Sequence, residues 1–207
     1  MSQQQTKNCI TLQGSAQIIC EYLKFAINSV LFQRGLCSPE TFKTEQQYGI
    51  TLLLSEDAEI KSFLTKVLAQ TEEWILNKKI SKLSLVIFNV ANEEILECWD
   101  FNLQYEDGDA ALSKENNETI GSKDLKQIQQ KIREVMLQVA ATISYLPFLD
   151  SRCSFDFFAN VKADCDVPEN WTVSEPVFIA NAQNVPFKIF STSLHKMETV
   201  VSYKFVD

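Results

Sequence analysis

For catalysis by a thiol and an imidazole the sequence offers a single histidine and six cysteines. Any Cys–His mechanism must use His195, because the thiol needs a nearby base or another cause of a lowered pKa. The cysteines have apolar neighbours, and no basic cluster lies beside them. We therefore predict that His195 is a hydrogen-bonded strand residue and that the cysteines are reduced and mostly buried. They are Cys9, Cys20, Cys37, Cys98, Cys153 and Cys165.

Sequence patterns for metals and cofactors are also missing. No two cysteines have C-x-x-C spacing, and one histidine does not complete a zinc site. The five glycines are scattered singly, so there is no glycine-rich phosphate loop. We expect no metal, no cofactor and no enzymatic activity. The alternative from this class is a small cytosolic thiol enzyme.

The composition is ordinary for a soluble globular protein. The chain has 207 residues, of which 22% are charged, and its net charge is −8. That charge argues against a nucleic-acid partner, since phosphate binding needs clustered Lys and Arg. The sequence has no apolar run as long as a membrane span, and its first residues lack the pattern of a signal peptide. We expect an intracellular protein without nucleic-acid or membrane partners.

Three stretches have the apolar spacing of helices. The first, residues 15–34, carries two apolar rows with a step of four residues, Ser15 as the predicted N-cap, and Gly35 as a left-handed stop. The second opens at Ser55 and ends near Lys78. The third runs from Asp124 to about Tyr145, with a core stripe at Leu125, Ile128, Ile132, Val135, Met136, Val139 and Ile143.

Strand patterns fill most of the remaining chain. Residues 82–90 and 95–104 read as a hairpin, and residues 153–159 alternate in character. The C-terminal stretch 161–207 is more polar and is interrupted by prolines, with strand-like runs at 177–180, 187–194 and 199–206. Polar strands of this kind specify their register weakly. Helices followed by a sheet predict one α+β domain over residues 1–207.

Leu137 breaks the pattern of the third helix. It lies opposite the core stripe, beside polar residues that include Arg133, and Tyr145 follows two turns later. A single exposed leucine is common. A leucine with a nearby tyrosine on an otherwise polar face also fits a protein–protein interface. The sequence leaves both interpretations open.

Several segments together resemble the HORMA domain family, and within it the spindle-checkpoint member. The resemblance covers residues 9–205, and its motifs occur in the family's order. They are residues 27–35 (INSVLFQRG), 38–42 (SPETF), 146–147 (LP), 153–156 (CSFD), 167–169 (VPE) with Trp171, and 192–196 (TSLHK).

The resemblance implies three helices on a mainly antiparallel sheet, with a mobile C-terminal "safety belt" at residues 161–207. It also implies an open and a closed arrangement; in the closed one the belt crosses the sheet and traps a partner peptide. The peptide would add as a strand to the edge formed by Cys153, Ser154, Phe155, Asp156, Phe157 and Phe158. The implied belt residues are Trp171, Leu194, His195, Val201 and Tyr203.

The implied partners are a checkpoint scaffold protein at kinetochores and the activator of the anaphase-promoting complex, whose capture delays anaphase. Conformer-specific regulators and an open–closed self-dimer would use a face with Arg133, Leu137, Gln138 and Tyr145, and an AAA+ remodelling ATPase is a further implied partner. The family more usually has Arg where Leu137 stands, and a leucine cannot form a bidentate ion pair.

The implied location is nucleus and cytoplasm, with kinetochores and the nuclear envelope region in mitosis. Alternatives within the family are an adaptor of translesion DNA polymerase zeta and a meiotic-axis protein.

Overall fold

The computed structural model describes residues 10–107, 120–121 and 123–204. Within them are the helices α1 (Leu12–Gln33), α2 (Ala58–Leu76) and α3 (Leu125–Ala141), with 3₁₀ turns η1 (Pro39–Thr41) and η2 (Thr142–Ser144). The strands are β1 (Ile10–Thr11), β2 (Phe42–Gln47), β3 (Ile50–Ser55), β4 (Ile80–Asn89), β5 (Ile95–Tyr105), β6 (Ile120–Gly121), β7 (Cys153–Val161), β8 (Ala182–Pro186), β9 (Phe190–Ser191) and β10 (His195–Lys204).

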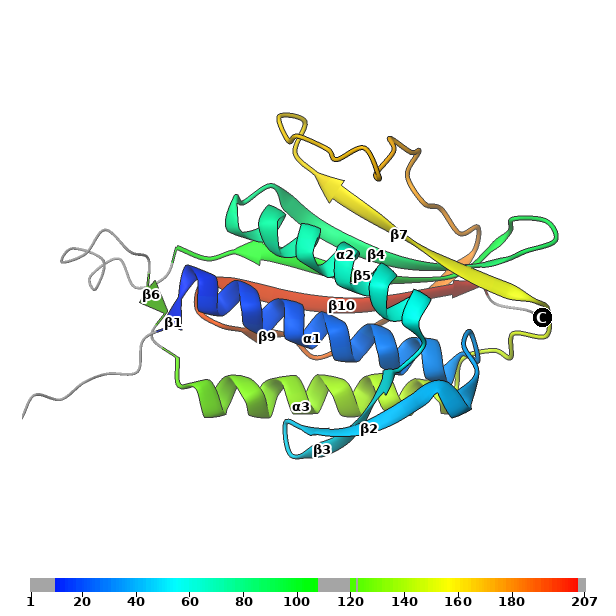
Figure 1. The fold of residues 1–207 in the computed structure, drawn as a ribbon, viewed down its shortest axis with the longest axis horizontal. Helices are drawn as coiled ribbons and strands as arrows, with labels where there is room; N and C mark the ends of the chain where they lie inside the picture. The colour runs from blue at the N-terminus through cyan, green and yellow to red at the C-terminus, as the bar shows by residue number, and fades with distance from the viewer. Residues whose placement is uncertain (1–9, 108–119, 122, 205–207) are drawn as a thin grey trace, which may run out of the picture.

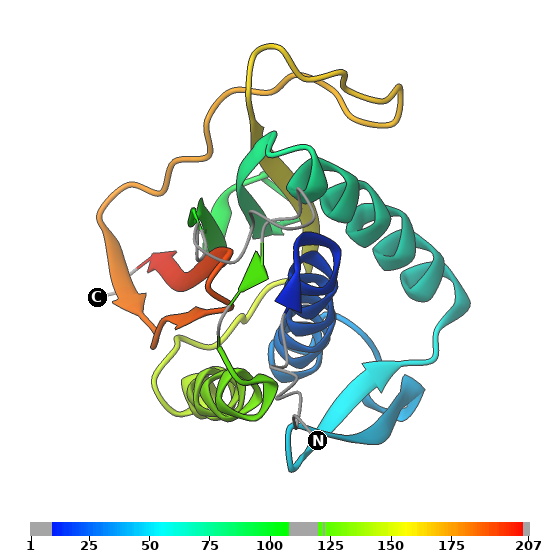
Figure 2. The same ribbon diagram turned by 90° about the vertical axis from the view of Figure 1, so that its left-hand side faces the viewer.

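One antiparallel sheet organises the molecule. Its strand order is β7-β4-β5-β10-β8, and β9 also pairs with β10. Helix α1 runs along one face of this sheet, with α2 and α3 on either side of it (Figures 1 and 2). The hairpin β2–β3 packs against α1, and β1 pairs with β6. The α+β prediction of three helices on an antiparallel sheet is confirmed, and none of the helices in the described part is long and apolar enough to cross a membrane.

Helix α1 begins earlier than its apolar rows indicated. Thr11, not Ser15, is the N-cap, and its side chain accepts a hydrogen bond from the Gly14 N–H at 3.1 Å. Ser15 is fully buried inside the helix. The predicted stop is confirmed, because Gly35 has φ +64° and its N–H donates to the Phe32 carbonyl. Both candidate caps are hydroxyl residues, so the sequence alone could not choose between them.

The region before α2 holds a hairpin that the sequence analysis missed. Ser55 ends β3 rather than opening a helix, and Asp57 caps α2 by accepting from the N–H groups of Glu59 and Ile60. β2 was missed because most of its side chains are polar and exposed, so it has no apolar alternation. Its turn is formed by Tyr48 and Gly49, which both have positive φ.

The ends of the third helix also differ from the prediction. α3 stops at Ala141 and continues as the 3₁₀ turn η2, so Tyr145 lies outside it. Five of the seven predicted core positions are buried, but Leu125 and Ile143 are exposed. These two belong to the first turn of α3 and to η2, where the stripe has already left the core.

The C-terminal strands form at positions shifted from the predicted ones. Residues 177–180 are not a strand, and β8 starts just after them. Of residues 187–194 only β9 is a strand, whereas β10 begins four residues earlier than expected, at His195. Pro186 closes β8 on an outer strand of the sheet, where a missing N–H is tolerated. β10 alternates strictly, with five buried side chains: His195, Met197, Thr199, Val201 and Tyr203.

Candidate functional site

Strand β7 forms one end of the sheet and has an unused edge. It pairs with β4, with Phe157 opposite Leu85, and no other described strand lies beside it. The Phe157 N–H donates to the carboxylate of its neighbour Asp156 at 2.7 Å, so it points away from β4. Since N–H groups alternate along a strand, the Phe155 N–H faces the same way. The edge predicted from Cys153, Ser154, Phe155, Asp156, Phe157 and Phe158 therefore offers backbone donors to a further strand.

A groove of about 760 Å³ runs along this edge, between β7, α2 and the chain that follows β7. The α2 wall contributes Phe63, Val67 and Trp74. From the other side comes Val173, whose side chain is 97% exposed. Phe63 and Val173 are left open to the groove, whereas Val67 and Trp74 are already buried. Open apolar side chains favour an apolar ligand surface that would cover them.

Residues 162–181, the spanning segment, connect β7 to β8 (Figure 2). Val167 and residues 170–177 of this segment form the outer wall of the groove. Its start is tied to the end of α2, because the Lys162 N–H donates to the Lys79 carbonyl and Lys79 pairs with Asp164 at 2.7 Å. Further along, the indole of Trp171 packs edge-on against that of Trp74, with ring centroids 5.0 Å apart. Beyond Trp171 the segment is mostly exposed until β8 begins. It thus crosses from one end of the sheet to the other.

The far end of the spanning segment is held by β8, β9 and β10. β10 pairs with nine residues of β5, from His195 opposite Tyr105 to Tyr203 opposite Glu97. Of the predicted belt residues, only Trp171 lies at the groove. The other four, Leu194, His195, Val201 and Tyr203, are buried in the core. In this arrangement the C-terminal strands lie on β5 and the β7 edge is unused by the described strands.

His195 is a buried structural residue in this arrangement. Its Nδ1 lies 2.6 Å from the Ser15 hydroxyl, which also contacts the Thr192 hydroxyl at 2.5 Å. All three side chains are fully buried, so no substrate reaches this Ser–His pair. Burial lowers the pKa of His195 to about 4. The prediction of a hydrogen-bonded strand histidine is confirmed.

The buried thiols are also unsuited to nucleophilic chemistry. Burial raises the pKa of Cys20 and of Cys98 to about 12, so neither forms a thiolate near neutral pH. The five cysteines of the described part, Cys20, Cys37, Cys98, Cys153 and Cys165, are all free, and Cys9 lies outside the described residues.

The predicted α3 face combines exposed apolar residues with polar ones that are already engaged. Leu137 is 48% exposed, and Tyr145 is 43% exposed. The Gln138 side chain accepts from the Lys188 N–H at 2.7 Å, and Glu134 pairs with the Lys188 ammonium at 3.0 Å. Arg133 is half-buried, and its Nε lacks a hydrogen-bond partner in the described part. The face therefore continues from α3 onto the loop between β8 and β9.

Almost the whole chain is similar to known proteins. Residues 15–201 match the profile of the HORMA domain. The chain belongs to the HORMA domain family. It is 39% identical over 195 residues to the mitotic spindle assembly checkpoint protein MAD2A of Homo sapiens, covering 94% of this chain and 93% of that protein. It is 35% identical to the mitotic spindle checkpoint component mad2 of Schizosaccharomyces pombe, covering 99% and 98%.

Solved structures show the same HORMA fold. A chain from the crystal structure of a mitotic checkpoint complex superposes with a TM-score of 0.82 at 34% identity, covering 93% of this chain and 99% of that chain. The HTP-2 protein of C. elegans bound to a HIM-3 closure motif superposes with a TM-score of 0.73, covering 95% and 93%. That likeness is at 12% identity, so it shows the fold alone.

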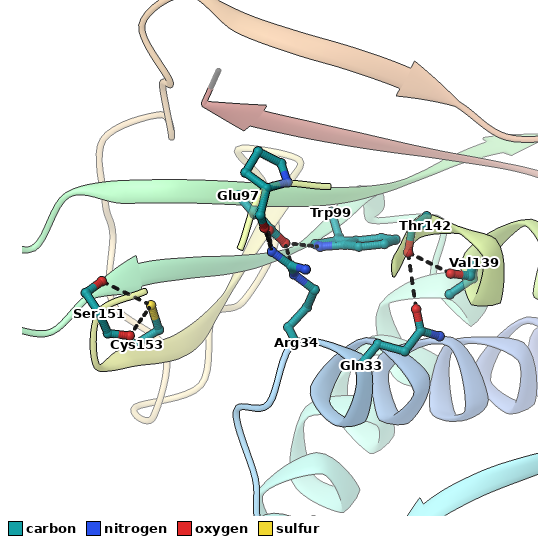
Figure 3. A network of polar contacts seen from close by, with 9 residues as sticks. Gln33, Arg34, Glu97, Trp99, Val139, Thr142, Ser151 and Cys153 are labelled. Atoms are coloured by element: carbon teal, nitrogen blue, oxygen red, sulfur yellow. Dashed lines mark hydrogen bonds and ion pairs between the residues drawn. The ribbon is translucent and has the colours of Figure 1, made fainter. Parts of the chain in front are cut away.

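The structure also contains a buried ion pair that the sequence did not predict. Arg34, at the end of α1, reaches Glu97 on β5 with contacts of 2.5 and 3.1 Å, and the Trp99 indole donates to the same carboxylate at 3.2 Å (Figure 3). Arg34 also donates to the Pro147 carbonyl at 2.5 Å. Burial raises the pKa of Glu97 while Arg34 opposes that shift. The network ties α1 and β5 to the chain leading into β7. The sequence does contain a hint of it, because Glu97 lies in phase with the apolar residues Trp99 and Phe101 on the buried side of β5.

Proposed function

We propose that this chain is an adaptor of the spindle assembly checkpoint that traps an extended peptide between β7 and the spanning segment. The observation that carries the proposal is the unused β7 edge, which lies inside a groove lined by exposed apolar side chains. Relatives named as spindle checkpoint proteins, 35–40% identical over nearly the whole chain, support the same function.

A peptide would bind by adding a strand to β7. Its carbonyls would accept from outward N–H groups such as those of Phe155 and Phe157, and Asp156 would first have to release the Phe157 N–H. Peptide side chains that face α2 would meet Phe63 and Val67. Because the spanning segment covers the groove, release requires that segment to move, which places the affinity in a slow off-rate.

The specific partners belong to the proposal. We infer that the trapped peptides come from a checkpoint scaffold protein at kinetochores and from the activator of the anaphase-promoting complex. Trapping the activator would delay anaphase. The α3 face, with Arg133, Leu137, Gln138 and Tyr145, would serve an open–closed self-dimer and conformer-specific regulators. An AAA+ ATPase would reopen the closed form, and the protein would act in nucleus and cytoplasm, at kinetochores and near the nuclear envelope.

A second candidate within the family is an adaptor of translesion DNA polymerase zeta. The chain is similar to the DNA polymerase zeta subunit 2 of Drosophila melanogaster, but at 23% identity over 141 residues, covering 68% of this chain and 66% of that protein. The similarity to checkpoint relatives is higher and longer. The likeness to solved structures at 12% identity shows the fold alone and adds no support for a meiotic-axis role.

The test is capture of partners from mitotic extract by the immobilised full chain, with bound proteins identified by mass spectrometry. We expect the checkpoint scaffold and the anaphase-promoting-complex activator, and we expect both to be lost with Phe155→Pro. In cells depleted of their own checkpoint adaptor, the chain should restore arrest when microtubules are depolymerised. Recovery of polymerase zeta subunits without the activator, and failure to restore arrest, would favour the second candidate.

A further inference from the structure

We propose that two buried polar contacts between α1 and β10 set the register in which β10 pairs with β5. The contacts are Tyr22 with Thr199 and Ser15 with His195. The proposal concerns the fold of the free protein and stands whether or not the proposed function holds.

The side-chain pattern of β10 cannot fix this register alone. Its buried and partly exposed positions alternate strictly over ten residues. A slip by one residue would invert the two faces, but a slip by two would keep the alternation and leave four of the five buried positions occupied by another inward-facing residue of β10. Another feature must therefore distinguish the observed register from its neighbours two residues away.

The polar contacts provide that feature. The Tyr22 hydroxyl lies 2.6 Å from the Thr199 hydroxyl, and the Ser15 hydroxyl lies 2.6 Å from His195 Nδ1. All four residues are 0–1% exposed. Ser15 and Tyr22 are separated by about 10 Å along the helix axis, and His195 and Thr199 by about 13 Å along the strand. The two pairs thus match the helix to the strand at two points.

A slip by two residues would separate both pairs. Met197 or Val201 would replace Thr199 opposite Tyr22; the valine has no hydrogen-bonding atom, and the methionine thioether is only a weak acceptor. Buried hydroxyl and imidazole groups left without partners are costly, so each slipped register should be populated at least about tenfold less than the observed one.

Other contacts oppose a slip less strongly. Gln183, which accepts from the Tyr203 hydroxyl, belongs to β8 and would move together with β10. The pair between Lys188 and Glu134 is largely exposed, and exposed pairs contribute little. The backbone bond from the Glu106 N–H to the Leu194 carbonyl has equivalents in a slipped ladder.

The register matters because it fixes the far anchor of the spanning segment. β8 pairs with β10 over five residues, so the anchor at Ala182 moves with β10. A slip of two residues would displace it by about 7 Å. That displacement would pull the spanning segment tighter over the groove or leave it looser. This effect on the groove matters only if the proposed function holds.

The native Cys98 allows the register to be measured directly. Ser202 lies opposite Cys98 in the observed ladder, and Val200 and Lys204 would lie opposite it after a slip of two residues in either direction. Three reporter variants, Ser202→Cys, Val200→Cys and Lys204→Cys, are equilibrated in a glutathione redox buffer. Their bridges to Cys98 are quantified by mass spectrometry of proteolytic peptides. In the parent protein we expect the Ser202→Cys bridge to exceed either slipped bridge at least about tenfold.

The decisive comparison repeats the three reporter measurements in two further backgrounds. Tyr22→Phe/Thr199→Val removes both hydroxyls of one contact, so neither is left unpaired, and Ser15→Ala removes the other contact. Each should lower the preference for the in-register bridge at least about fivefold. The matched control is Ser29→Ala, which removes a buried α1 hydroxyl that makes no described contact with β10. If the double variant does not unfold cooperatively, Tyr22→Phe alone serves, since it removes only the hydroxyl. If the preference for the in-register bridge stays within twofold of the parent value in both Tyr22→Phe and Ser15→Ala, the proposal is overturned.

Discussion

At the residue scale, His195 gives the fold a pH dependence. Its pKa is lowered from the ordinary 6.5 to about 4 by burial. The unfolded chain therefore binds a proton at a higher pH than the native protein does, and stability falls as pH drops from about 6.5 to about 4, by at most about 3 kcal/mol. Urea unfolding at a series of pH values measures this loss. The His195→Gln variant should lose less stability across the same window; an equal loss in both proteins would show that His195 does not contribute.

Leu137 should matter for association and not for folding. Because its side chain is 48% exposed, Leu137→Glu should change the free energy of unfolding by no more than about 0.5 kcal/mol. It should weaken self-association, measured by sedimentation velocity, because it places a charge in an apolar patch. Gln127→Glu, an exposed change of equal charge near the start of α3, is the control. A large loss of stability in Leu137→Glu would show that the residue is part of the core.

The Arg34–Glu97 pair should behave as a buried charge pair. Both side chains are 5% exposed or less, so Glu97→Gln leaves the guanidinium without a counter-charge and should cost about 3–5 kcal/mol. Glu56→Gln breaks the exposed pairs with Lys43 and Lys61 and should cost far less, because solvent screens exposed charges. Chemical denaturation of the two variants makes the comparison. Equal effects would mean that solvent screens the Arg34 site.

At the scale of elements, the β7 edge can be tested by one substitution. Phe155→Pro removes an N–H that points away from β4, so β7 should keep its pairing with β4 and lose capture of a partner peptide. Because the Phe155 ring also packs near Phe63, Phe155→Ala is the matched control, which loses the ring and keeps the N–H. Peptide binding by a folded Phe155→Pro protein at the level of Phe155→Ala would falsify the assignment of this edge.

Elements with long, regular apolar spacing could be predicted from the sequence, and those decided by tertiary contacts could not. The body of α1 and the hairpin β4–β5 follow from local pattern. The hairpin β2–β3 was missed because its exposed residues carry no alternation, although the turn at Tyr48 and Gly49 is a local signal. The position of β10 depends on pairing with β5 about a hundred residues earlier, which no local window contains.

The same division applies to the candidate site. The alternation of β7 and the family resemblance placed the edge strand, which the structure locates at the end of the sheet. The α2 wall with Phe63 and Trp74 could be predicted only as part of a helix, since nothing in the sequence shows that residues 162–181 pass opposite it. The β7 edge, the α2 wall and the spanning segment are far apart in the sequence, and only folding brings them together.

At the scale of the whole molecule, enclosure of the ligand can be tested with a covalent bridge. In Ser202→Cys, oxidation would join β10 to Cys98 on β5 and keep the spanning segment anchored at its far end. Oxidised before mixing, this protein should fail to capture a peptide that carries a folded domain at each end, and oxidised afterwards it should not release it. The measurement is retention on a column, with Cys98→Ala/Ser202→Cys as a variant that cannot form the bridge. Equal capture by oxidised and reduced protein would rule out enclosure.

The position of β10 in the sheet also sets the order in which a newly made chain is completed. β10 is the last of the described strands to be synthesised, and its partner residues in β5 precede it by about a hundred residues. At ribosomal speeds, roughly 5 to 20 seconds separate the two. β7 is made later in that interval, and from then until β10 follows, the sheet β7-β4-β5 has a free edge on each side and the spanning segment has no anchor at its far end. A nascent chain therefore passes once through a state in which a peptide meets β7 with nothing to move aside.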